Sequence, residues 1–125
     1  MGRRSGIAAA VLPLALVTAG LAGAPAAVAG ESGADACTHP AWSNQDPGTD
    51  ELRGSETEAP VRSGPNAGCG TVGYLHYETV SLDCFVVNSA GNTWSHIQFT
   101  SSIGKKISGW IYDPHLAGNG SGYYC

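Results

Sequence analysis

Four histidines, ten carboxylates and several serines are the side chains of this 125-residue chain that could do catalytic or metal chemistry. A zinc site needs several Cys or His ligands at short spacings, and the chain contains neither a C-x-x-C nor an H-x-x-x-H arrangement. A G-x-S-x-G turn, which would expose a serine nucleophile, is also absent. Asp83 could pair with a histidine, but exposed strand or loop positions explain both residue types. We therefore expect no enzyme, no metal and no other cofactor.

The aromatic side chains are better candidates, because peptides and glycans stack on exposed rings. Trp94 alternates with Ile97 and Phe99 along one predicted strand. If Ile97 and Phe99 fill the core, Trp94 faces outward or into a groove. Packing is the competing interpretation for Trp94 and the favoured one for Trp110. Trp42 lies further toward the N-terminus.

The first 29 residues are predicted to be a secretory signal peptide. Arg3 and Arg4 precede an apolar run, Ile7 to Leu21, and the sequence Ala27-Val28-Ala29 is typical of a cleavage site. The run is shorter than the roughly 20 residues that span a bilayer. Cleavage after Ala29 leaves 96 residues for export, with no membrane insertion.

A 96-residue exported chain is enough for one small domain, whose core needs covalent support. All four cysteines follow the predicted cleavage site: Cys37, Cys69, Cys84 and Cys125. An even number in an oxidising compartment predicts two disulfides. The expected location is therefore extracellular or associated with the cell wall.

Charge divides the exported part into two segments. Residues 31–58 carry seven acidic side chains and one basic one, Arg53, with no hydrophobic period, so residues 30–58 are predicted to be an extended, flexible acidic arm. Residues 59–125 carry three acids and three bases and form the predicted domain. A neutral domain argues against a nucleic-acid partner, which would require clustered Lys and Arg.

The domain is predicted to be all-β, because short apolar segments alternate with Gly, Asn and Pro turns and no segment has a helical period. The alternation is clearest after Thr79, where Val80, Leu82 and Cys84 share one face and Asp83 lies on the polar one. The expected strands cover residues 59–62, 71–75, 80–86, 93–99 and 107–112. Five short strands leave fewer exposed edges when they close into a barrel.

Five spaced elements carry a family resemblance: VRSGP from Val61, TVGYL from Thr71, VSLDC from Val80, NTWSHI from Asn92 and GWI from Gly109. In this order they resemble a bacterial SH3 domain of the exported, cysteine-containing actinobacterial type. The resemblance covers residues 59–116. It implies a five-stranded SH3-like barrel and a helical turn at residues 113–115 that returns Leu116 to the core.

The resemblance also implies positions for the cysteines and the ligand groove. Cys69 falls in the loop after Pro65 and Cys84 in the long strand, and closing their loop of about 16 residues would contribute on the order of 3 kcal/mol. We therefore predict the pairs Cys69–Cys84 and Cys37–Cys125, although four cysteines allow three connectivities. The predicted groove residues are Tyr74, Tyr77, Trp94, Tyr112 and His115.

These observations predict a secreted, non-catalytic SH3-like binding module for cell-wall peptide or another extracellular ligand. Proline-rich ligands are not expected, because the stretch Tyr112-Asp113-Pro114-His115 departs from the Pro and Tyr pair of polyproline-binding relatives. The competing hypothesis is a secreted disulfide-rich protein-interaction or inhibitor-type mini-protein.

Overall fold

The computed structural model describes residues 37, 38 and 40–125, so the predicted signal peptide lies outside the described residues. Along these residues run β1 (Thr49–Asp50), β2 (Ala59–Arg62), β3 (Thr71–Leu75), β4 (Val80–Val87), β5 (Thr93–Thr100), β6 (Lys106–Tyr112) and the 3-10 helix η3 (Asp113–His115). No helix in this part of the chain has the length and apolar character needed to cross a membrane. The all-β prediction is confirmed.

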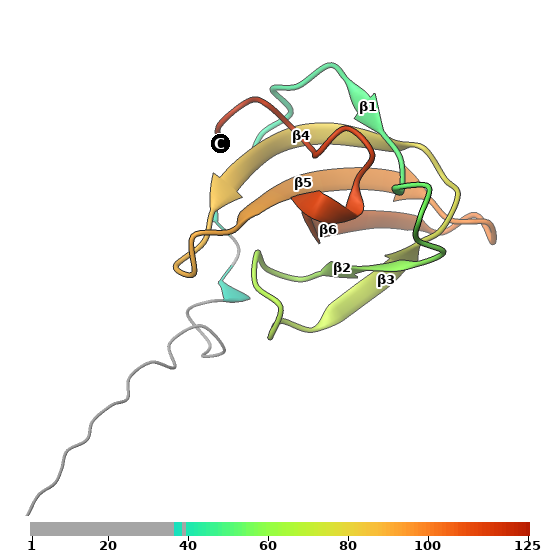
Figure 1. Ribbon diagram of the computed structural model, residues 1–125, viewed down its shortest axis with the longest axis horizontal. Helices are drawn as coiled ribbons and strands as arrows, with labels where there is room; N and C mark the ends of the chain where they lie inside the picture. Colours follow the sequence, from blue (N-terminus) through green and yellow to red (C-terminus); the bar gives the residue numbers. More distant parts are fainter. Residues whose placement is uncertain (1–36, 39) are drawn as a thin grey trace, which may run out of the picture.

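One antiparallel sheet contains all six strands in the order β1-β4-β5-β6-β2-β3. The sheet curls into a half-barrel, with β2 and β3 below the layer of β4, β5 and β6 in the view of Figure 1. The predicted turn between β4 and β5 is held by the Asn88 side chain, which accepts hydrogen bonds from the backbone N–H groups of Ala90 and Asn92. β1 and β3 form the edges of the sheet.

The inner face of the curl holds the hydrophobic core. Its members alternate along the strands as expected from the period-2 pattern, and Leu116, delivered by η3, is fully buried among them. At Gly109 a side chain would collide with β2, since a Cβ there would lie 2.7 Å from the carbonyl oxygen of Arg62. The core residues are Leu52, Ala59, Val61, Leu75, Val80, Leu82, Ile97, Phe99, Ile107, Ile111 and Leu116.

The outer face of β4, β5 and β6 is covered as well. His96 is fully buried there, with the Trp42 ring stacked on it at a centroid distance of 3.8 Å and the Trp110 ring meeting it edge-on at 5.1 Å. We call Trp42, Asp83, His96, Gln98 and Trp110 the outer-face cluster. Because of this cluster, the middle of β5 is buried on both faces.

Residues 40–58, part of the predicted flexible acidic arm, contact the sheet at several points, although most of their side chains are exposed. The backbone N–H groups of Gln45 and Asp46 both donate to the Asp83 carbonyl, and β1 pairs with β4. Leu52 is buried and forms an isolated bridge with Leu116. The acidic composition concealed this docking, because it does not show which groups find partners: the Asp50 carboxylate, for example, accepts hydrogen bonds from the N–H groups of Gly118 and Gly120.

The disulfides are Cys37–Cys69 and Cys84–Cys125, so two disulfides are present but both predicted pairings were wrong. The C-terminal segment explains the difference: Tyr124 bridges to Phe85 in parallel and the Cys125 N–H donates to the Phe85 carbonyl. Strand pairing therefore brings Cys125 beside Cys84. Two disulfides indicate an oxidising, extracellular environment.

Candidate functional site

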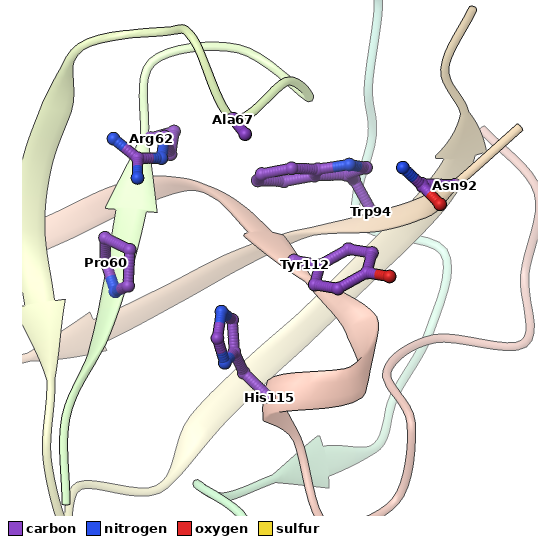
Figure 2. A pocket seen from close by; sticks show the side chains of 7 residues that line it. All are labelled: Pro60, Arg62, Ala67, Asn92, Trp94, Tyr112 and His115. Atoms are coloured by element: carbon purple, nitrogen blue, oxygen red, sulfur yellow. The ribbon is translucent and has the colours of Figure 1, made fainter. Parts of the chain in front are cut away.

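A pocket of about 280 Å³ opens on the outer face between β2 and the β5–β6 pair. Figure 2 shows Pro60 and Arg62 on one side, Trp94 and Tyr112 on the other, and His115 below them. We call it the Trp94 pocket. Its lining residues are Pro60, Arg62, Ala67, Asn92, Trp94, Tyr112 and His115. Three predicted groove residues, Trp94, Tyr112 and His115, are thus brought together.

Two neighbouring rings make the apolar wall of the Trp94 pocket. Trp94 on β5 is directly opposite Tyr112 on β6, so their side chains share a face, with ring centroids 5.5 Å apart. Trp94 does point to the outer face, but only 4% of it is exposed. Its Nε1 is buried and has no hydrogen-bond partner among the described residues. Trp94 therefore combines packing with lining of the pocket, whereas Tyr112 is half-buried.

Arg62 supplies positive charge to the opposite wall. Its Nη1 donates to the Cys69 carbonyl at 3.1 Å and to Thr71 Oγ1 at 3.0 Å. Thr71 is the register partner of Arg62 on β3, and Cys69 is held by its disulfide to Cys37. The guanidinium is therefore positioned by the β2–β3 hairpin before any ligand arrives.

His115 closes the lower end of the pocket from η3. Its Nδ1 lies 2.6 Å from Glu56 Oε1, and both side chains are less than one third exposed. A carboxylate only accepts hydrogen bonds, so it favours the tautomer with a proton on Nδ1. The ring points into the pocket in Figure 2, so Nε2 is the ring nitrogen left for a ligand.

Tyr74 and Tyr77, the other two predicted groove residues, are not among the residues that line the Trp94 pocket. Tyr74 is opposite Pro60 in the β2–β3 register, so its half-exposed side chain lies on the same face as that wall. Tyr77 is 81% exposed and lines a separate shallow depression with His76, Glu78 and Ser102.

A second polar group lies in the outer-face cluster, contrary to the expectation that Asp83 and His96 are exposed. Because Leu82 belongs to the core, alternation places the next side chain, Asp83, in the cluster on the outer face. Asp83 Oδ2 accepts from His96 Nδ1 at 2.7 Å, and Gln98 Nε2 donates to both carboxylate oxygens. Because Asp83 is fully buried, these donors replace its lost water.

The same cluster has the connectivity of a Ser–His–Asp triad, since Ser108 Oγ lies 3.4 Å from His96 Nε2. A nucleophile and base of this kind must both reach a substrate carbonyl. Ser108 is exposed, but the His96 ring is fully enclosed, with Trp42 and Trp110 against it. The arrangement is therefore suited to holding the cluster together rather than to acyl transfer.

Asp113, at the start of η3, supports the pocket from behind. Burial raises the pKa of its carboxyl; hydrogen bonds from Ser95 and Thr93 oppose this rise, and the charge of Asp50 adds to it. The Ser95 hydroxyl donates to Asp113 Oδ1 at 2.7 Å. This contact ties η3, and with it His115, to β5.

Four residues of the pocket were not predicted from the sequence: Pro60, Arg62, Ala67 and Asn92. For two of them the sequence did contain a signal. Pro60 and Arg62 alternate with the core residues Ala59 and Val61, and this alternation places Pro60 and Arg62 on the outer face. Among the described residues, no group of three or more His, Cys, Asp or Glu side chains could hold a metal ion.

Comparison with protein-family models, curated proteins and solved structures gives no match.

Proposed function

We propose that this protein is a secreted, non-catalytic SH3-like binding module whose Trp94 pocket receives a segment of cell-wall peptide or another extracellular peptide. The observation that carries the proposal is the convergence of Trp94, Tyr112 and His115 on one pocket. An apolar wall with a few positioned polar groups is the usual composition of a ligand site.

The SH3-like part of the proposal is supported by the order of the elements. Strands β2 to β6 begin within a residue of the five predicted strands, and η3 follows β6 and leads to the buried Leu116. β1, formed by residues 49–50, is a sixth strand in addition to the five predicted ones. Secretion is supported by the two disulfides and by the leader sequence.

A pull-down of the mature protein on purified peptidoglycan sacculi tests the proposal. We expect retention at moderate salt, lost in the double variant Tyr112→Ala, His115→Ala. Tyr123→Ala is the matched control, because Tyr123 is half-exposed and is not among the residues of the Trp94 pocket. No retention removes the wall-binding function, and retention that survives the double variant moves the site elsewhere.

A second candidate, a protein-interaction or inhibitor-type mini-protein, is favoured by one observation. Tyr77 and Ile103 are 81% and 85% exposed, and Ser102, next to Ile103, lines a depression with Tyr77. Large exposed apolar side chains that gather in one region are typical of protein-binding surfaces. Capture of an extracellular protein that requires Tyr77 and Ile103 but not Tyr112 would support this candidate instead.

A further inference from the structure

The Trp94 pocket contains one positioned cation. Arg62 is the one Lys or Arg among the described residues that line it. The two hydrogen bonds of Nη1 orient the guanidinium, and its Nε and Nη2 groups have no hydrogen-bond partner among the described residues. Arginine N–H groups form short, charge-assisted hydrogen bonds with carboxylates and bind them in a two-pronged geometry.

The lower end of the pocket offers the opposite polarity. Glu56 favours the proton on Nδ1 of His115, and in that tautomer Nε2 is an acceptor. Glu56 contacts Nδ1 of this ring and is not among the residues that line the pocket. The pocket thus has the N–H donors of Arg62 on one side and Nε2 of His115 at its lower end. The rings of Trp94 and Tyr112 form its aromatic wall.

We propose, building on the proposed function, that the Trp94 pocket selects peptides that carry a free carboxylate next to an apolar side chain. Arg62 binds the carboxylate, Trp94 and Tyr112 contact the apolar side chain, and His115 Nε2 accepts a peptide N–H. The anion is a carboxylate rather than a phosphate, because phosphate recognition uses clustered cations and Arg62 is the one Lys or Arg among the described residues that line the pocket.

The test compares two probes that differ only in the charged group: N-acetyl-Ala-Phe with a free carboxylate and the same dipeptide with a carboxamide. Titrations of the isotope-labelled mature protein are followed by NMR, with the Trp94 indole N–H signal as reporter. We expect the free acid to bind about 10-fold more tightly, the factor that about 1.4 kcal/mol provides.

Arg62→Gln is expected to abolish this preference while both probes still bind weakly. Lys105→Gln is the matched control, because it removes the same charge at an exposed position that is not among the pocket residues. Dispersed amide signals show that each variant is folded.

Equal affinity for the two probes, or a preference that survives in folded Arg62→Gln, overturns carboxylate selection. Tighter binding of inorganic phosphate than of the free acid overturns the choice of anion. Retention on sacculi without a response to either dipeptide overturns this inference and leaves the proposed function standing. If the protein is not retained on sacculi and its NMR signals respond to neither dipeptide, the proposed function is overturned.

Discussion

His96 Nδ1 lies 2.7 Å from Asp83 Oδ2, and both side chains are completely buried on the outer face of the sheet. The inner face of the same strands carries the apolar core. A small domain buries a modest share of its surface, so a second buried layer adds to its stability. The outer-face cluster is therefore a structural element in its own right.

The first prediction concerns this pair. Asp83→Ala leaves His96 and Gln98 without their buried acceptor, so we expect a loss of about 3 kcal/mol in the free energy of unfolding. Ser108→Ala, which removes an exposed hydroxyl from a 3.4 Å contact, should change it by less than about 0.5 kcal/mol. Urea denaturation of both variants provides the measurement, and equal losses would show that the buried pair is not the stabilising element.

The second prediction concerns Ser108 as a nucleophile. Because the His96 ring is enclosed by Trp42 and Trp110, we expect no labelling of Ser108 by an aryl fluorophosphonate. Intact-protein mass spectrometry checks this, with Ser108→Ala as the control for labelling elsewhere. A Ser108 adduct that disappears in His96→Ala would reassign the cluster as a catalytic triad.

The third prediction is the disulfide map. Non-reducing peptide mapping should recover Cys37 with Cys69 and Cys84 with Cys125. Removing either pair as a double Ser variant should lower the free energy of unfolding by about 2–4 kcal/mol through lost loop closure. Recovery of a peptide joining Cys69 to Cys84 would contradict the described fold.

The fourth prediction uses two nearby glycines. Gly120 has a φ of 79°, and a Cβ there would collide with Asp113 Oδ1 and Ser95 Oγ. Gly120→Ala should therefore destabilise the protein by about 2 kcal/mol. Gly122→Ala, with nothing within 4 Å of its Cβ, should have little effect. Thermal denaturation distinguishes them, and equal midpoints would contradict the described geometry at Gly120.

The fifth prediction follows from the raised pKa of Asp113. Below its ordinary pKa the carboxyl is neutral in both folded and unfolded chains. As the pH rises, the unfolded chain ionises first, so the stability of the wild type falls until the pH exceeds the raised folded pKa. Asp113→Asn lacks this titration.

The stability of the wild type relative to Asp113→Asn should therefore decrease from pH 3 to neutral pH and then level off. Denaturation midpoints across this range measure the difference. A relative stability that rises with pH would mean that the Asp113 pKa is lowered, contrary to its burial.

The sequence predicted the strands from short apolar segments, mostly bounded by Gly, Asn or Pro turns, and the clearest period of two is in β4. β2 and β3 begin and end where predicted, and η3 returns Leu116 to the core. β1 was missed because Thr49 and Asp50 have no apolar pattern, and its pairing with β4 is a backbone contact. Asp83 lies on the face that alternation predicted, but its burial was missed, because the pattern does not show that Trp42 packs over its partner His96.

The candidate site was predictable only in part. Strand parity placed Trp94 on the outer face, and the resemblance added Tyr112 and His115. Alternation placed Arg62 on the outer face, but its position in the pocket could not be recognised, because it depends on β2 pairing with β6, a long-range arrangement that local pattern does not encode. Loop-closure entropy was likewise a poor guide to the disulfides, since strand pairing decides which sulfurs meet.

The two disulfides close consecutive rings, residues 37–69 and 84–125, rather than one ring inside another. A protease cut within either ring leaves both ends of the chain covalently attached. Only a cut between Cys69 and Cys84 separates the two halves, and that stretch includes β3, an edge strand of the sheet. In a protease-rich environment, the lifetime of the molecule therefore depends chiefly on residues 70–83.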